Sequence, residues 1–234
     1  MENRVALVTG STSGIGRETT VRLLKNKIMV IGLGRDHKKF KPKLDGYLPI
    51  TIDLSDFESI ARIIPRVLSE HPKIDIFVSN AGYGDFKSLE NFSDKRVFEF
   101  LNLNLTSHIL MSKYLVKHMK SRSGGDIVFL GSEAALAGKK RGSLYSAAKF
   151  GLRGFAQALR AECGSAGIRV CLINPGFVRS PFFESLNFEP GLEENNAIEA
   201  KDVAKVILDV ISLRKGTVID EVNLSPASMS IMFK

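Results

Sequence analysis

The sequence predicts an α/β fold in which a doubly wound parallel sheet carries helices on both faces. Short, almost wholly apolar runs alternate along the chain with longer stretches of helical spacing. The first apolar run leads into a glycine-rich turn, and later runs also end in glycine or small polar residues. Open parallel sheets bind their ligands at the carboxyl ends of the strands, where these residues would lie. Apolar residues make up 44% of the 234 residues, which is enough for one large core.

The first strand is predicted over residues 4–9, and the helix after it has apolar positions at Val21, Leu23 and Leu24. A glycine turn between a strand and a helix is the setting of a dinucleotide phosphate site, because glycines allow close approach and the helix supplies N–H donors. Three residues separate Gly10 from Gly14, so an ordinary strand-to-helix turn is the alternative. The turn residues expected to bind a cofactor are Gly10, Ser11, Thr12, Ser13, Gly14, Ile15 and Gly16.

The end of the second strand bears on the choice of cofactor. An acidic residue there would bind the ribose 2′-hydroxyl of NAD, whereas an arginine would accommodate the 2′-phosphate of NADP. Asp36 stands close to the expected acidic position. Strand geometry instead makes Gly34 the end residue and Arg35 the first loop residue, where a guanidinium can cover a phosphate. We therefore expect NADP(H), with NAD(H) as the alternative.

Later strands also end in polar or glycine residues. They are predicted at residues 48–52, 74–79, 126–130 and 169–173. The residues that follow are Asp53 and Leu54, Asn80-Ala81-Gly82, Gly131-Ser132, and Asn174-Pro175-Gly176. Such residues are common in ordinary turns, but their recurrence at successive strand ends predicts a ligand site along one edge of the sheet. Asp53 and Leu54 are placed to contact adenine.

Tyr145 and Lys149 lie four residues apart, about one helical turn, which brings both side chains to one helix face. Gly142 and Ser143 are expected to open this helix, so Tyr145 would lie in its first turn, where the helix dipole favours negative charge. The ammonium should lower the phenol pKa from its usual value of about 10. The pair suits proton exchange beside a nicotinamide, although by spacing alone a Tyr and a Lys are far more often an exposed helix face.

With these motifs in order, the chain resembles the short-chain dehydrogenase/reductase family over roughly residues 4–222. The resemblance rests on Thr9-Gly10-x-x-x-Gly14-Ile15-Gly16, Asn80-Ala81-Gly82, Asn104, Ser132, Tyr145-x-x-x-Lys149 and Pro175-Gly176. It implies a Rossmann-like domain and an oxidoreductase that transfers a hydride between nicotinamide and a carbonyl or alcohol substrate. The implied catalytic set is Asn104, Ser132, Tyr145 and Lys149.

The resemblance also assigns roles to individual residues. Tyr145 would act as general acid/base, Ser132 would hold the carbonyl oxygen, and Lys149 would hold the ribose. Asn104, in a long helix, would hold a proton-relaying water; its alternative is a helix-surface asparagine. The remaining cofactor contacts would come from Asn80, Ala81, Gly82, Pro175, Gly176, Val178 and Ser180. Two residues depart from the family pattern: Ser180 replaces a frequent Thr, and Glu133 replaces a small residue at the pocket rim.

The net charge of +8 raises the possibility of a nucleic-acid partner. No nucleic-acid motif accompanies the basic residues, and they are scattered apart from residues 37–43 and 139–141. We therefore expect no nucleic-acid partner. Each cluster either is a solvated surface or attracts an anionic cofactor or substrate. A nucleic-acid-binding module and a non-catalytic cofactor-binding regulator remain the alternatives to an enzyme.

We expect residues 1–234 to form one domain, with a flexible flap over the substrate at about residues 177–200. Phe177, Phe182 and Phe183, joined by Tyr83, would line the pocket or pack on neighbouring helices. The absence of a signal peptide and of a membrane-length apolar run predicts a cytoplasmic protein. The two cysteines fit no metal pattern, so no metal site is expected. Helices near 94–120 and 145–166 carry a second apolar face, which predicts a homodimer or homotetramer.

Overall fold

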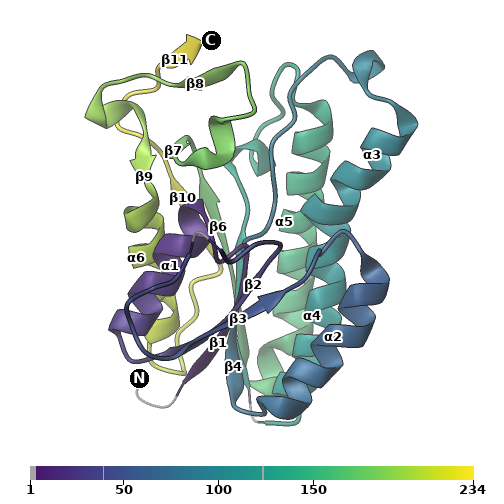
Figure 1. Cartoon of the computed structure of the whole chain (residues 1–234), viewed down its shortest axis with the longest axis vertical. Coiled ribbons are helices and arrows are strands. Elements are labelled where there is room, and N and C mark those ends of the chain that lie inside the picture. Colours follow the sequence, from purple (N-terminus) through teal and green to yellow (C-terminus); the bar gives the residue numbers. More distant parts are fainter. Residues whose placement is uncertain (1–3, 39, 123) are drawn as a thin grey trace.

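The structure, a computed structural model, describes residues 4–38, 40–122 and 124–234, so Lys39 of the first basic cluster lies outside the described residues. A seven-stranded sheet forms its centre, with the strand order β10-β6-β5-β4-β1-β2-β3 (Figure 1). All of its strand pairs are parallel, which confirms the predicted sheet. The strands are β1 (Val5–Thr9), β2 (Met29–Gly34), β3 (Tyr47–Thr51), β4 (Ile74–Ser79), β5 (Gly125–Leu130), β6 (Ile168–Pro175) and β10 (Glu221–Leu224).

Helices cover both faces of the sheet, as predicted (Figure 1). One face packs against α1 (Gly14–Lys25) and α6 (Ala200–Ser212), and the opposite face packs against α2 (Phe57–Glu70), α4 (Ser107–Lys120) and α5 (Ser143–Cys163). A further helix, α3 (Asp94–Leu101), leads into α4 through a π-helical turn at Asn102–Thr106. The two hydrophobic cores therefore lie on either side of the sheet, each between strands and helices.

The amino ends of the central strands are tied together by a buried ion cluster. The Asp126 carboxylate on β5 is only 3% exposed. It accepts hydrogen bonds from Arg4 Nη2 at 2.6 Å and from Arg169 Nε at 2.6 Å. Arg4 Nε also donates to the Asp75 carboxylate at 2.7 Å. The buried Asp126 carboxylate is thus paired with two guanidinium groups at this end of the sheet, and the candidate site lies at the opposite, carboxyl ends of the strands.

Short elements and a C-terminal strand cover the carboxyl ends of the strands. Residues 177–200 contain β7 (Val178–Arg179), a 3₁₀ turn (Pro181–Phe183), β8 (Phe188–Pro190), a second 3₁₀ turn (Glu194–Asn196) and β9 (Ile198–Glu199). Strand β7 pairs in parallel with β9, and β8 pairs antiparallel with β11 (Ile231–Phe233). This ribbon lies above the sheet, at the end of the molecule marked by the C-terminus (Figure 1). The expected flap is thus built partly from a distant segment.

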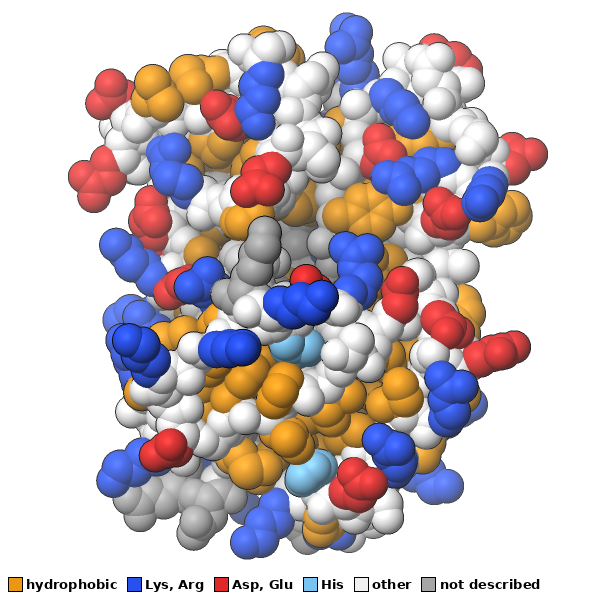
Figure 2. All heavy atoms as spheres, in the orientation of Figure 1, with side chains coloured by type: hydrophobic (Ala, Val, Ile, Leu, Met, Phe, Trp, Pro, Cys, Tyr) orange, Lys and Arg blue, Asp and Glu red, His pale blue; other side chains and the backbone are white. Residues whose placement is uncertain are grey.

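Basic side chains are distributed over the face seen in Figure 2, with acidic side chains among them. Several basic side chains of the described residues are in ion pairs, for example Arg96 Nε with Asp85 at 2.8 Å. Of the helices in the described parts of the chain, none is long and apolar enough to cross a membrane.

Candidate active site

A cavity of about 800 Å³ opens at the carboxyl ends of the strands, beneath the ribbon of β8 and β11. It brings together most of the predicted site residues, which come from six separate parts of the chain. Those that line it are Gly10, Ser13, Gly14, Ile15, Asn80, Ala81, Gly82, Asn104, Ser132, Tyr145, Lys149, Pro175, Gly176, Val178 and Ser180. The predicted residues outside its lining are Ser11, Thr12, Gly16, Arg35, Asp53 and Leu54.

The glycine turn has the geometry of a phosphate cradle. Gly10 and Gly14 adopt positive φ angles of 64° and 48°, which glycine tolerates best. A side chain on Gly16 would overlap the Gly10 carbonyl, so helix and turn are in direct contact. At the start of α1, the Ser13 side chain makes no cap hydrogen bond and the first turn holds no acidic residue. The N–H groups there are consequently available to an anion, and a dinucleotide pyrophosphate fits this turn.

Asn80, which directly follows β4, is hydrogen-bonded to the residue before the glycine turn. Its Nδ2 donates to the Thr9 carbonyl at 2.9 Å, and its backbone N–H donates to Thr9 Oγ1 at 2.8 Å. The Ala81 N–H donates to the same hydroxyl oxygen at 3.0 Å. The two strand ends are therefore fixed relative to each other by a buried threonine, which is 1% exposed.

Tyr145 and Lys149 both face the cavity from α5 and are 8% and 5% exposed, so the alternative of an exposed helix face is wrong. Lys149 Nζ lies 5.7 Å from the centre of the Tyr145 ring and donates a hydrogen bond to the Leu130 carbonyl at 2.9 Å. Burial lowers the pKa of Lys149 from 10.5 to about 8. Among the described residues, no carboxylate is hydrogen-bonded to the Lys149 ammonium.

The expected lowering of the Tyr145 pKa is wrong for this structure. Burial raises that pKa to about 12; a hydrogen bond with Ser132 opposes the rise, and the Glu133 carboxylate adds to it. Desolvation acts on the whole charge of the phenolate and is the largest cause of the shift. Tyr145 is therefore held as a neutral phenol that can donate a proton.

Ser132 and Asn104 are fixed by backbone partners. Ser132 Oγ accepts from the Ala134 N–H at 3.1 Å, and the Ser132 N–H donates to Asn174 Oδ1 at 3.3 Å. Asn104 is fully buried, so the alternative of a helix-surface asparagine is wrong. Its Oδ1 accepts from the Tyr83 N–H at 3.1 Å, while its Nδ2 donates to the Phe100 carbonyl at 3.1 Å. Asn104 lies within the π-helical turn, a local irregularity that often marks functional sites.

The residues expected at the adenosine end lie beyond the cavity. Arg35 is exposed and directly follows β2. Asp36 is also exposed, but its Oδ1 accepts a hydrogen bond from the Lys38 N–H at 2.8 Å within the same loop. Asp53 Oδ1 similarly accepts from Ser55 Oγ at 2.7 Å. Leu54 is 6% exposed and packs into the core beside α2.

Ser11 has a different environment from the rest of the glycine turn. Its side chain is fully buried, and its Oγ lies 3.1 Å from the hydroxyl of Tyr47 on β3. Tyr47 in turn contacts His37, which follows Arg35 by two residues. Sequence reasoning missed both partners. His37 could have been noted within the basic cluster, but nothing local distinguishes Tyr47.

Aromatic side chains form the wall around Tyr145. The Phe86 ring lies 5.0 Å from the Tyr145 ring, and the Phe182 ring lies 6.1 Å from it. Phe188 of β8 packs on Phe86 at 5.3 Å. Strand β11 and the residues before it add Met229, Ile231 and Phe233 to the lining. Phe86, Phe188 and these three residues were not anticipated, because no periodicity links them to the strand-end motifs.

The cavity rim carries charge. Glu133 Oε1 lies 4.0 Å from Lys139 Nζ, which places the unusual acid beside the basic cluster of residues 139–141. Lys140 and Arg141 also line the cavity. Arg141 adopts a φ of 59°, a left-handed conformation that a non-glycine residue seldom takes. The cluster therefore lies at the rim of the cavity, where we expect the substrate mouth.

A family model described as short chain dehydrogenase matches residues 4–190. The 3-oxoacyl-[acyl-carrier-protein] reductase FabG of Haemophilus influenzae is 33% identical over 218 residues, covering 88% of this chain and 90% of the relative. The (2S)-[(R)-hydroxy(phenyl)methyl]succinyl-CoA dehydrogenase subunit BbsD of Thauera aromatica is 31% identical over 193 residues, covering 80% of this chain and 77% of that subunit.

Solved structures give the same picture of the fold. A short chain dehydrogenase/reductase family protein superimposes with a TM-score of 0.86 at 27% identity, covering 96% of this chain and 97% of the other. A metagenomic short-chain oxidoreductase in complex with NADP gives a TM-score of 0.83 at 25% identity, with 96% and 97% coverage. The 3-ketoacyl-(acyl-carrier-protein) reductase from Brucella melitensis, complexed with NADH, gives 0.87 at 22% identity, with 96% and 98% coverage.

Proposed function

The chain belongs to the short-chain dehydrogenase family and is an NAD(P)-dependent oxidoreductase acting on CH–OH groups; we propose that it interconverts carbonyl and alcohol substrates with NADP(H), using Tyr145 as general acid/base. The observation that carries this proposal is the meeting of Tyr145, Ser132 and Lys149 in one cavity beside the glycine turn. These residues are far from the turn in sequence, and only the fold brings them there.

The chain's own residues divide the chemistry as follows. A bound nicotinamide supplies or accepts the hydride at the substrate carbon. In the reductive direction, Tyr145 donates its hydroxyl proton to the carbonyl oxygen, which stays bonded to the carbon and becomes the neutral hydroxyl of the alcohol product. Ser132 hydrogen-bonds that oxygen and fixes its position. Lys149 stabilises the resulting phenolate, and Asn104 holds the water through which the proton is replaced.

The glycine turn and the start of α1 would hold the pyrophosphate, and Lys149 would hold the nicotinamide ribose. Asn80, Ala81, Gly82, Pro175, Gly176, Val178 and Ser180 complete the proposed cofactor contacts, since all of them line the cavity. Arg35 supports NADP(H) over NAD(H): it is exposed beside the turn, while the competing Asp36 carboxylate is engaged by the loop backbone.

The proposal for Tyr145 is tested with Tyr145→Phe, which keeps the ring and its packing but removes the proton. We expect at least an ~10²-fold loss in kcat for ketone reduction, the lower bound for general acid catalysis. Affinity for NADPH, measured by fluorescence titration, should stay within about twofold, since the change removes no charge-assisted bond. A variant that keeps more than about a tenth of parental turnover contradicts the assigned role.

The proposal for Arg35 is tested with Arg35→Ala. A guanidinium–phosphate bond is worth ~1.5–3 kcal/mol, so NADPH affinity should fall about 10- to 150-fold. NADH affinity should hardly change, because NADH lacks the 2′-phosphate. Titration of both cofactors measures the two dissociation constants. Equal losses for NADPH and NADH, or tighter binding of NADH by the parent protein, would assign ribose recognition to Asp36 instead.

The aromatic wall supports a substrate with an apolar body next to its carbonyl group. A non-catalytic regulatory role is less well supported, because Tyr145 and Lys149 are both present and both buried in the cavity. A panel of aliphatic and aryl ketones, with NADPH consumption as readout, identifies the substrate class.

A further inference from the structure

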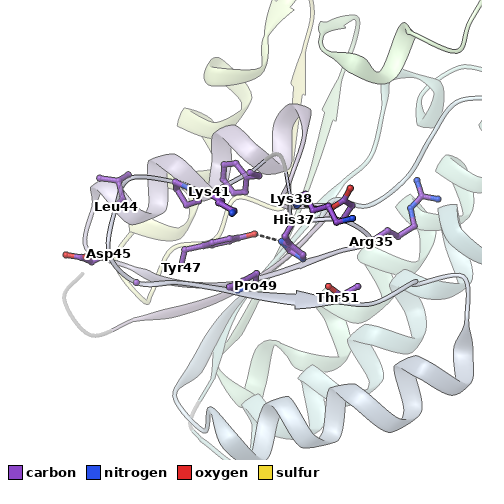
Figure 3. Close-up of a pocket in the computed structure, with 13 residues that line it drawn as sticks. Arg35, His37, Lys38, Lys41, Leu44, Asp45, Tyr47, Pro49 and Thr51 are labelled. Atoms are coloured by element: carbon purple, nitrogen blue, oxygen red, sulfur yellow. Dashed lines mark hydrogen bonds between the residues drawn. The ribbon is translucent and has the colours of Figure 1, made fainter.

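The connection from β2 to β3 lacks the helix that accompanies every other crossover of the main sheet. Among residues 35–46, those that the structure describes form only turns and extended chain. A hollow of about 910 Å³ lies beside this loop (Figure 3). Its floor includes Tyr47, Pro49 and Thr51, alternate residues on one face of β3. The loop that carries Arg35 must therefore be held by contacts other than helix packing.

A chain of three hydrogen-bond contacts supplies that hold. Ser11 Oγ lies 3.1 Å from the Tyr47 hydroxyl. The same hydroxyl lies 2.9 Å from His37 Nδ1 (Figure 3). His37 Nε2 lies 3.1 Å from the Ile50 carbonyl oxygen. Both imidazole nitrogens are therefore anchored to β3, and β3 is anchored to the glycine turn. The chain joins the expected pyrophosphate site to the loop of Arg35.

The donors and acceptors in this chain have one consistent direction when His37 is neutral. The Ile50 carbonyl can only accept, so Nε2 carries the proton and donates. Nδ1 is then an acceptor and receives the Tyr47 hydroxyl proton. Tyr47 has no second proton, so Ser11 donates to the Tyr47 oxygen at 3.1 Å in preference to the more distant Leu33 carbonyl at 3.5 Å. Burial raises the pKa of Tyr47 and thereby keeps it a donor.

Packing adds to the hold. The Phe40 ring, only 4% exposed, meets the Tyr47 ring edge-on at 5.2 Å. Gly32 lies so close to Ser11 and Tyr47 that a side chain there would lie 2.5 Å from both. His37 reaches the end of β2: a side chain on Gly34 would lie 3.4 Å from its Nε2 and 3.2 Å from Thr12 Cγ2. His37, Thr12 and the end of β2 thus converge at the base of Arg35.

We propose that Tyr47 and His37 are positioning residues that hold the Arg35 loop for the 2′-phosphate of NADP, in place of the missing helix. The inference rests on the proposed preference for NADP(H). Neither residue needs to touch the phosphate itself. Tyr47 acts through His37, and His37 acts by fixing the loop two residues after Arg35. Losing the Tyr47 hydroxyl should therefore weaken recognition of the 2′-phosphate and leave the rest of the adenosine site intact.

The test is calorimetric binding of two fragments, 2′,5′-ADP and 5′-AMP, which differ only in the 2′-phosphate. Tyr47→Phe keeps the ring packing and removes the hydroxyl, with its hydrogen bonds to Ser11 and His37. We expect the Kd for 2′,5′-ADP to rise about three- to tenfold, in line with the neutral hydrogen bond to His37 that holds the loop. The Kd for 5′-AMP should change less than about twofold on the same grounds. His37→Gln is the second variant, and Tyr114→Phe, on α4 and half-buried, is the matched control.

A double-mutant cycle shows whether Tyr47 acts through Arg35. In an Arg35→Ala background, Tyr47→Phe should cause no further loss of 2′,5′-ADP affinity, because the group it positions is gone. Equal weakening of both fragments by Tyr47→Phe and His37→Gln, no weakening by either, or additive losses in the cycle would overturn the inference. A parent protein that binds 2′,5′-ADP no more tightly than 5′-AMP would overturn the NADP(H) preference as well, so the two failures are distinguishable.

Discussion

At the residue scale, Lys149 combines a functional position with a cost to stability. The side chain is 5% exposed, and it donates a hydrogen bond to the Leu130 carbonyl. Burial lowers its pKa from 10.5 to about 8, which corresponds to a cost of about 3 kcal/mol while the group is charged. The fold carries this cost at neutral pH. A desolvation cost of this kind is common where a residue serves the chemistry of a site and not the stability of the fold.

Lys149→Met should therefore stabilise the protein at pH 7, by up to about 2 kcal/mol after the lost hydrogen bond is subtracted. Between about pH 8 and 10.5 the unfolded chain keeps the Lys149 proton while the folded protein releases it, so parental stability gains with pH. The advantage of the variant should thus shrink as pH rises through this window. Urea unfolding at pH 7 and pH 10 measures it, with Lys117→Met on α4 as control. A pH-independent difference, or a less stable variant at pH 7, would contradict this account.

At the scale of elements, the junction of β1 and α1 depends on close backbone contact. A Cβ on Gly16 would collide with the Gly10 carbonyl and with Asn80, which itself braces the turn. The helix cannot move away without opening the cradle, because Leu23 and Leu24 further along α1 are buried in the core. Gly154 in α5 is the contrasting case, since a Cβ there would meet nothing within 4 Å.

Gly16→Ala should consequently weaken NADPH binding at least tenfold and destabilise the fold by roughly 1–3 kcal/mol through overpacking. Gly154→Ala should leave NADPH affinity unchanged and stabilise the helix by up to ~1 kcal/mol. Cofactor titration and urea unfolding of both variants make the comparison. If the two alanine variants behave alike, the contact between the glycines does not govern the turn.

At the scale of the whole molecule, three helices, α3, α4 and α5, each expose an apolar side chain. Phe98 on α3 is 67% exposed, Phe150 on α5 is 43% exposed, and Ile109 on α4 is 36% exposed. The remaining apolar residues of α4 and α5 are largely turned into the core against the sheet. These exposed side chains support the proposal that the protein is a homodimer or homotetramer.

Sedimentation at micromolar concentration should therefore show a species at least twice the 25.7 kDa of one chain. Phe150→Glu should shift it toward the monomer, because a carboxylate would be buried unpaired in an interface. Glu194→Gln, at the opposite ribbon, is a control for changing surface charge. A single 25.7 kDa species for the parent protein would refute the homo-oligomer.

Most strands of the parallel sheet, the glycine turn and the candidate site residues along the strand ends could be predicted from the sequence alone. Each of these is written in neighbouring residues: apolar runs such as the one in β1, glycines at positions needing positive φ, and two side chains one helical turn apart. Motif order along the chain then indicated the family. Such patterns can be interpreted without knowledge of the tertiary contacts, because backbone sterics and the periodicity of side chains are local properties.

The pKa shifts and the contacts that support the site became known only from the three-dimensional structure. The spacing of Tyr145 and Lys149 gave the wrong direction for the tyrosine pKa, because burial depends on every atom packed around the ring. The π-helical turn at Asn104, the place of β11 over the cavity and the link from Ser11 through Tyr47 to His37 also join residues that no local pattern connects. Desolvation and long-range hydrogen bonds are properties of the assembled fold, which is why the sequence alone left them open.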